Sequence, residues 1–319
     1  MCGANKYKLI IDKFEKKSVV SHSYFDFLFK DGTKRLTFMS HLRRVILDKS
    51  GFYVKHIEEK PSFFGLEWDG ELGVEDPRIT KIGDLYVMTY VSLSRNENVS
   101  TSYAVSNDCI RWYRRGVIFN EQNKDVVMFP EQIDNEYVAI ERPEGSFEFS
   151  PPHMWLVYSK DMELWGRQHP MIISKKNDWD SGKVGAGAPP IKTEKGWLLI
   201  YHGVIEGKKK KLIEKIITKM DLTECMFGKI TQKNTIYCAG AVLLDLNDPK
   251  KIIGRSNVPI LFPFKKHEEA DFGNLKVIFP TGSILDLNGK DLLIFSGAGD
   301  KVTTVKQLSL ENIFRKLGV

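Results

Sequence analysis

The sequence predicts an all-β protein, a five-bladed β-propeller with one short helical insertion, formed as a single domain over residues 1–319. Three observations lead to this prediction. Runs of β-branched and aromatic residues of strand length recur along almost the whole chain. A seven-residue motif occurs twice, 53 residues apart. One segment, residues 206–225, has apolar residues at helical rather than strand spacing.

Strand-like segments alternate with turn signals along the chain. Six segments have the length and composition of strands: residues 84–94, 136–143, 153–159, 196–204, 240–246 and 291–299. Residue pairs that favour turns separate them, at Asp31-Gly32, Asp69-Gly70, Asp134-Asn135 and Asn288-Gly289. Short strands divided by such turns are typical of all-β folds.

The repeated motif has the form Ser-x-Asp-x-x-x-Trp and occupies residues 106–112 and 159–165. Each copy lies between two predicted strands, and residues 244–256 take an equivalent place without the tryptophan. A period of about 50 residues, with about four strands per unit, is typical of β-propellers. The 319 residues allow six such units at most, and five once the chain ends and the insertion are set aside. We expect the tryptophans to pack between blades.

The segment 206–225 breaks the strand pattern. Its apolar residues are spaced as on one face of a helix, at Leu212, Ile213, Ile216, Ile217 and Met220. This spacing predicts a short amphipathic helix inserted between two strands. Two positions for the helix are open, on the rim of the propeller or against a partner subunit of a homo-oligomer.

The composition is that of an ordinary soluble globular protein, with 42% hydrophobic and 28% charged residues. No window approaches the roughly 18 apolar residues of a membrane span, and the N-terminal residues lack a signal-peptide core. We therefore expect a cytoplasmic protein that binds no membrane. Much of the net charge of +6 lies in the run 208–211, which favours a solvated surface over nucleic-acid binding. The four cysteines show no metal or redox spacing.

Asp76, in the stretch GVEDPRIT, is the first candidate for chemistry. Pro77 biases its backbone towards an extended form, and Glu75 and Arg78 flank the pair. A neighbouring glutamate can raise the pKa of an aspartate, and a raised pKa suits a general acid. The alternative is an aspartate that merely starts a turn before a strand.

Further candidates come from strand edges that are far apart in the sequence: Lys124, Arg142, Lys183, His202, Tyr237 and Asp300. In a propeller such edges converge at the central channel. One carboxylic acid facing several cations would form a site for phosphate beside a leaving group that can be protonated. For Arg142 the alternative is a surface ion pair with Glu141 or Glu144.

The stretch from Lys183 to Pro190, KVGAGAPP, is poor in side chains. We expect a loop here, either a binding edge at which a ligand approaches the backbone or a tight turn that needs small residues. Phosphate-binding glycine loops, zinc-protease motifs and nucleophile elbows are absent from the sequence, so no cofactor or metal is expected.

The motifs together resemble glycoside hydrolase family 130, the β-mannoside phosphorylases and their hydrolytic relatives. The matching stretches are GVEDPRIT, DVVMFPEQIDNEYVAIERP, KVGAGAPPIKTEKGWLLIYHGV, YCAGAVLLDLNDPKKIIGRS, and VIFPTG with the later SGAGD. They come in the order of the family and cover roughly residues 66–316.

This resemblance implies a five-bladed β-propeller that cleaves β-mannosidic bonds of short mannooligosaccharides with inorganic phosphate, with inversion, to give α-mannose 1-phosphate. Asp76 would be the acid and would act through a hydroxyl of the mannose. Basic residues at three positions, Lys124, Arg142 and Lys183, would hold the phosphate. His202, Tyr237 and Asp300 would line the same pocket.

The chain departs from the family pattern in its first blade. An arginine of the family corresponds to Ser40 or His41, unless Arg43 or Arg44 takes its place, and the usual asparagine is missing from residues 23–32. Two other activities therefore stay open. One is a hydrolase of the same fold, with a glutamate base at position 75, 131 or 141, and the other is a propeller that binds sugar without catalysis.

Overall fold

The computed structural model describes residues 13–23, 26–67, 69–95, 98–120, 122–144, 151–175, 178–205, 210–220, 235–271 and 275–319. The chain divides into two compact units, Met1–Met39 and Ser40–Val319. The prediction of a single domain over the whole chain stays a prediction.

The first unit contains a short 3₁₀ turn, η1 (Lys16–Ser18), and an antiparallel sheet of β1 (Val19–His22), β2 (Asp26–Phe29) and β3 (Lys34–Leu36). The predicted Asp31-Gly32 turn joins β2 to β3, with Gly32 at a φ of 82°. Phe14 packs edge-on against Phe29 at 4.8 Å between ring centroids, which gives this small sheet an apolar side.

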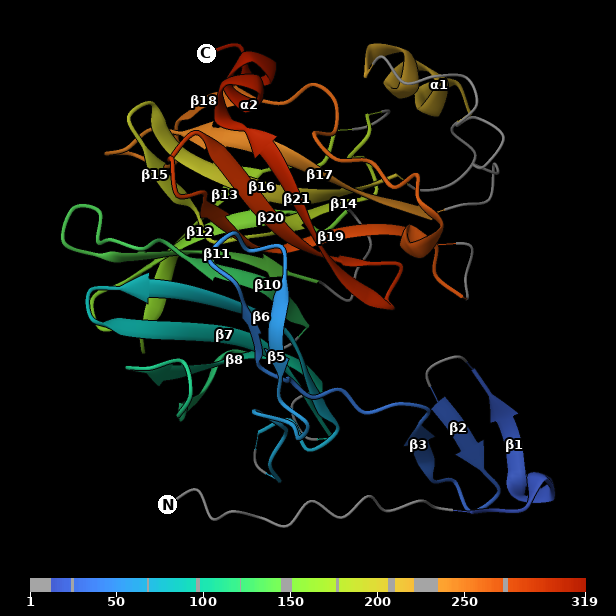
Figure 1. Ribbon diagram of the computed structural model, residues 1–319. Coiled ribbons are helices and arrows are strands. Elements are labelled where there is room, and N and C mark those ends of the chain that lie inside the picture. The colour runs from blue at the N-terminus through green and yellow to red at the C-terminus, as the bar shows by residue number, and fades with distance from the viewer. Residues whose placement is uncertain are drawn as a thin grey trace. The chain divides into compact units, whose positions relative to one another are not determined.

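The second unit consists of antiparallel groups of strands that follow one another along the chain (Figure 1). The first group consists of β4 (Val45–Leu47) and β5 (Val54–Ile57). The second group consists of β6 (Gly73–Ile82), β7 (Leu85–Ser94), β8 (Asn98–Ser106) and β9 (Tyr113–Phe119). The third is β10 (Asn123–Met128), β11 (Tyr137–Pro143), β12 (Met154–Ser159) and β13 (Trp165–Ile172).

The C-terminal half adds β14 (Lys183–Ala186), β15 (Ile191–Thr193), β16 (Gly196–Ile205), β17 (Thr235–Leu244) and β18 (Ile252–Arg255). The last group is β19 (Leu275–Leu285), β20 (Asp291–Ala298) and β21 (Val302–Ser309). A short parallel pairing of β17 with β19 joins these two groups into one sheet. If these two joined groups are counted separately, the described residues of this unit contain five groups of strands. Five is the number expected for a propeller of five blades.

The first strands of the last four groups lie close to one another. Strand β10 contacts both β6 and β14, and β19 contacts β6. This arrangement brings together the positions on β6, β10 and β14 from which Asp76, Lys124 and Lys183 come.

The repeated motif forms the turn between the third and fourth strands of a blade. In the first copy the Asp108 carboxylate accepts from the backbone N–H of Ile110, and in the second the Asp161 carboxylate does so from Glu163. Trp165 follows the second turn and packs against Phe119 of the preceding group, at 5.9 Å between ring centroids. For this tryptophan the expected packing between blades is confirmed.

The predicted helical insertion is confirmed as α1 (Lys210–Lys219), whereas residues 206–209 and 221–225 lie outside the described residues. Ile213 and Ile216 are buried in the core cluster that contains Trp179 and Ile236. The apolar face of the helix therefore packs on the chain's own blades. The hydrophobic effect explains this choice, since both side chains lose their contact with water within one chain.

A second helix, α2 (Leu310–Leu317), was not predicted. The Ser309 hydroxyl accepts from the backbone N–H of Asn312 at its start, and Gly318 ends it at a φ of 78°. Ile313 and Leu317 are buried against strands of the last two groups. Within the described residues, neither helix has the length and apolar character needed to cross a membrane.

Candidate functional site

Asp76 lies within strand β6 and not at the start of a turn, so the alternative interpretation of this residue is wrong. The register of β6 against β7 shifts between Glu75 and Arg78, and Asp76 takes a φ of 52° in the left-handed region. The guanidinium of Arg78 donates to the backbone carbonyl of Asp76 over 2.6 Å. The bulge thus turns the Asp76 side chain away from the regular ladder and holds it there.

Three carboxyl groups influence one another at this bulge. Burial raises the pKa of Asp76, and the Asp125 charge adds to this against the opposing charges of Arg78 and Lys124. Burial and the Asp76 charge also raise the pKa of Glu75. Asp300 stands on an exposed turn, yet desolvation of its carboxyl and the Asp76 charge raise its pKa too. A carboxyl that stays protonated above its usual range can act as a general acid.

Asp125, on β10, is the centre of the site, and sequence reasoning missed it. Its side chain is 1% exposed and contacts Arg78 Nη2 at 3.3 Å, Arg142 Nη1 at 2.8 Å and His202 Nε2 at 3.6 Å. Burial favours the protonated carboxyl, but the surrounding positive charges, Arg142 first, outweigh it and lower the pKa of Asp125 to about 2. Asp125 is therefore a permanent carboxylate that holds its neighbours in place.

The backbone at Asp125 repeats the arrangement at Asp76. The register of β10 against β11 shifts between Lys124 and Val127, and Asp125 has a φ of 56°. Strands β6 and β10, each the first strand of its group, therefore both have a bulge with an aspartate in the left-handed region. Aspartate is among the few residues that tolerate this conformation.

His202, on β16, is completely buried beside Asp125. Its Nε2 lies 3.3 Å from Arg142 Nη1, and because arginine only donates, Nε2 is the acceptor. Burial lowers the pKa of His202 to about 3, against the opposing effect of Asp125, so the ring is neutral at pH 7. His202 therefore contributes a neutral acceptor to the site rather than a charge.

The stretch that begins at Lys183 is strand β14 as far as Ala186, so the expectation of a loop there is wrong. It pairs with β16 and places Gly185 opposite His202. A Cβ atom at position 185 would lie 2.4 Å from His202 Cε1 and 2.5 Å from Asp125 Oδ2. Glycine is required here because the side chains of the site pack directly on the backbone.

The remaining candidates join this cluster through aromatic rings. The Lys183 ammonium lies over the Tyr237 ring at 5.6 Å, and the Tyr237 ring lies 6.2 Å from that of His202. Phe279, which sequence reasoning missed, stands 4.6 Å from the His202 ring and 5.2 Å beneath the Arg78 guanidinium. These rings form an apolar side of the cluster and strengthen its electrostatic interactions.

The structure therefore brings the seven predicted residues together, although their roles stay predictions. Arg142, Lys183, His202 and Tyr237 are linked by contacts around Asp125. Lys124 and Asp300 are linked through electrostatic interactions with the Asp76 carboxyl.

Of the three glutamates named as possible hydrolytic bases, Glu75 lies in this cluster. Its carboxylate accepts from the hydroxyl of Ser40 over 3.0 Å. Glu131 is exposed and paired with Lys192. Glu141 is buried and accepts from Asn123 over 2.7 Å and from a glutamine side chain on β13 over 2.9 Å. Both therefore have structural partners of their own.

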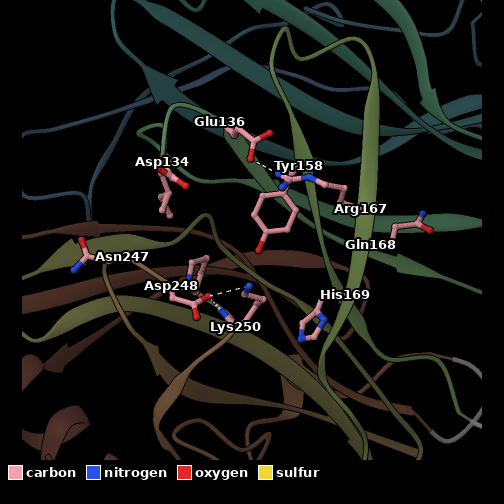
Figure 2. A pocket seen from close by; sticks show the side chains of 11 residues that line it. Asp134, Glu136, Tyr158, Arg167, Gln168, His169, Asn247, Asp248 and Lys250 are labelled. Atoms are coloured by element: carbon pink, nitrogen blue, oxygen red, sulfur yellow. Dashed lines mark hydrogen bonds and ion pairs between the residues drawn. The ribbon is translucent and has the colours of Figure 1, made fainter.

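A cavity of about 460 Å³ lies elsewhere, between the turn before β11, strands β12 and β13, and the turn after β17. None of the seven predicted residues lines it. Figure 2 shows the Arg167 side chain beside Tyr158, and the dashed lines of two ion pairs, Arg167 with Glu136 and Lys250 with Asp248. Because its charges pair with one another, we assign no chemistry to this cavity.

The buried neutral His202 makes a prediction for stability. Its pKa is about 3 in the folded chain against an ordinary value of 6.5, so between these pH values the unfolded chain binds a proton that the folded chain does not. The free energy of unfolding should therefore fall as pH decreases through this window, by up to about 1.4 kcal/mol per pH unit for this group. Urea unfolding at pH 4.5–7 measures the slope.

His202→Asn should reduce that slope by the equivalent of about one bound proton. The same slope in wild type and His202→Asn would show that His202 does not carry the pH dependence.

Comparisons with known proteins agree with this fold. The family model described as beta-1,4-mannooligosaccharide phosphorylase, of glycoside hydrolase family 130, matches residues 37–317. A 1,2-β-oligomannan phosphorylase of Thermoanaerobacter sp. strain X514 is 33% identical over 76% of this chain and 70% of that protein. A β-1,2-mannobiose phosphorylase of Listeria innocua is 30% identical over 91% of this chain and 72% of that protein.

A solved structure of the β-1,2-mannobiose phosphorylase from Listeria innocua, in complex with β-1,2-mannobiose, superposes with a TM-score of 0.76. It is 28% identical, and the match covers 96% of this chain and 78% of that one. The prediction of a five-bladed β-propeller is thereby confirmed. The family model spans the five strand groups and all seven predicted site residues, and the chain belongs to glycoside hydrolase family 130.

Proposed function

We propose that the protein is an inverting phosphorylase that cleaves β-mannosidic bonds with inorganic phosphate and releases α-mannose 1-phosphate. One observation carries this proposal: a carboxyl with a raised pKa, Asp76, faces a cluster of cationic side chains organised by the buried Asp125. An acid and an anion-binding group side by side are what phosphorolysis requires.

In the proposed reaction, a phosphate oxygen attacks the anomeric carbon from the face opposite the leaving sugar, and the configuration inverts. The bond between the anomeric carbon and the glycosidic oxygen breaks, and a bond to phosphate forms. Asp76 supplies the proton that the leaving oxygen takes up, passed through a hydroxyl of the mannose. Burial raises the pKa of Asp76, which favours the protonated acid that this step needs.

The cations have a different task. Phosphate is already a nucleophilic anion, so it needs positioning more than a catalytic base. Lys124, Arg142 and Lys183 would bind it and reduce its repulsion from the carboxylates of the cluster. A hydrolase would instead need a base to activate water, and of the three glutamates considered, Glu75 is the one within the cluster.

We further propose a β-1,2-linked mannoside as the substrate. The relatives that are 30% or more identical over most of this chain are named for β-1,2-linked oligomannan and mannobiose. A β-1,4-mannooligosaccharide phosphorylase of Ruminococcus albus is less similar, 27% identical over 75% of this chain.

The proposed reaction uses phosphate as co-substrate and no cofactor. We also propose a cytoplasmic location for the protein.

The test compares β-1,2-mannobiose and β-1,4-mannobiose, each with and without inorganic phosphate, assayed for mannose 1-phosphate and free mannose. We expect mannose 1-phosphate from the β-1,2 substrate when phosphate is present and from neither substrate when it is absent. Free mannose without sugar phosphate in every tube would identify a hydrolase. Mannose 1-phosphate from the β-1,4 substrate alone would overturn the proposed linkage.

A further inference from the structure

We propose that Glu144 occupies part of the phosphate-binding edge of Arg142 in the free protein, and that it must leave this edge when phosphate binds. Glu144 would thereby set the affinity for phosphate. The proposal rests on the proposed function, in which Arg142 holds phosphate.

The contacts of Arg142 suggest this role. Its Nη1 is paired with Asp125 at 2.8 Å, and its Nη2 donates to Glu144 Oε1. Its Nε is buried and makes no hydrogen bond with any described residue. Nε and Nη2 lie on the same edge of the planar guanidinium, which is an edge that binds oxyanions through two parallel hydrogen bonds. Glu144 therefore uses half of a two-donor edge.

A phosphate fits the whole edge better than Glu144 does. Two of its oxygens can accept from Nε and Nη2 together, which would also satisfy the buried Nε–H. The single contact of Glu144 leaves that donor without a described partner. The edge is thus complementary to a tetrahedral oxyanion rather than to the carboxylate that holds it.

The charges indicate that one carboxylate has to leave. Arg142 already faces two carboxylates, so a phosphate dianion would add to an excess of negative charge around one guanidinium. Asp125 is 1% exposed and also paired with Arg78, and leaving would cost it these contacts in a buried site. The Glu144 side chain is 24% exposed and can turn into water.

The backbone of Glu144 allows this movement. Its N–H donates to the Gln122 carbonyl over 2.7 Å, beside the pairing of β10 with β11. The main chain is held by this bond, so a rotation about side-chain bonds suffices to free the edge of Arg142. Exposed side chains change rotamer rapidly, so the exchange need not limit turnover.

Glu144→Gln tests the proposal, because glutamine keeps the shape of the side chain and removes its charge. A protein whose binding-competent state is only partly populated shows an apparent affinity reduced by that fraction. If the competent state is roughly a tenth to a half of the free protein, the variant should bind phosphate about two- to ten-fold more tightly. The KM for phosphate should fall by a similar factor, and the KM for the mannoside should stay the same.

Calorimetric titration with inorganic phosphate, without sugar, measures the affinity directly in wild type and variant. Glu144→Ala, which removes the acceptor altogether, should tighten binding at least as much. Glu163→Gln is the matched control, since Glu163 pairs with Arg115 on the surface and should change neither constant.

Phosphate affinity that is unchanged or weaker in both Glu144 variants would overturn the proposal, and a weaker affinity would indicate that Glu144 positions Arg142. Failure of the proposed function looks different, because wild type would then release no mannose 1-phosphate. The titration measures binding alone, so phosphate binding that the Glu144 variants tighten supports the proposal even if catalysis fails. The absence of phosphate binding in wild type and in both variants would overturn it.

Discussion

Asp76→Asn is expected to lower kcat for phosphorolysis by about 10²- to 10⁴-fold while leaving the fold intact. Asparagine has nearly the same shape as aspartic acid but cannot supply the proton that the leaving oxygen needs. Asp76 is partly buried at the bulge of β6, where Arg78 binds its backbone carbonyl rather than its carboxylate. The substitution should therefore keep the local backbone.

The measurement is the steady-state rate of mannose 1-phosphate release with β-1,2-mannobiose, compared with an aryl β-mannoside whose leaving group needs little protonation. A lost acid should slow the aryl substrate much less than the disaccharide. The matched control is Asp84→Asn, since Asp84 is exposed in the turn between β6 and β7. Equal losses with both substrates would mean that Asp76 is not the acid.

Gly185→Ala is expected to damage the site by crowding it. The new methyl group would stand 2.4 Å from His202 Cε1 and 2.5 Å from Asp125 Oδ2, distances at which atoms must move. Asp125 holds Arg78 and Arg142, so a shift of it displaces both cations. We expect kcat/KM to fall by about 10²-fold, because displacements near 1 Å can cost that much. Overpacking should also destabilise the fold by about 1–3 kcal/mol.

The control is Gly166→Ala, in strand β13, where an added Cβ atom meets nothing within 4 Å. Both variants are compared by kcat/KM with phosphate and by urea unfolding. Gly185→Ala with the activity and stability of Gly166→Ala would show that the site tolerates displacement of His202 and Asp125.

Several features of the fold were predictable because they depend on local sequence. Strand-length apolar runs and turn pairs indicated an all-β protein, and the Ser-x-Asp-x-x-x-Trp motif marked equivalent turns in successive blades. Helical spacing indicated α1. The capping residues of α2, Ser309 and Gly318, were readable in the same way but were overlooked.

The expectation of a loop over residues 183–190 failed at Lys183–Ala186, which is strand β14, for a physical reason. Glycine and alanine have low strand propensity, so the local sequence favours a loop. Tertiary packing decided otherwise, because β14 must approach the side chains of His202 and Asp125 so closely that no Cβ atom fits at position 185. Small residues are needed here because strands approach each other closely, and not because the chain turns.

Asp125 shows what sequence reasoning could not supply. Its partners Arg78, Arg142 and His202 come from β6, β11 and β16, and no local pattern links them. An aspartate in the run Lys124-Asp125-Val126 has the pattern of a polar residue at the start of a strand. The bulge that turns its side chain inward, with a φ of 56°, arises from the pairing of β10 with β11.

By itself, the sequence determined the fold class, the family and seven residues that the structure gathers in one cluster, because periodicity and motifs are local properties of the chain. Only the tertiary structure decided how these residues are charged and held. The neutral state of His202, the permanent charge of Asp125 and the occupied edge of Arg142 depend on burial and on partners from other strands. Desolvation and ion pairing are set by the packed assembly of strands, and no single segment contains them.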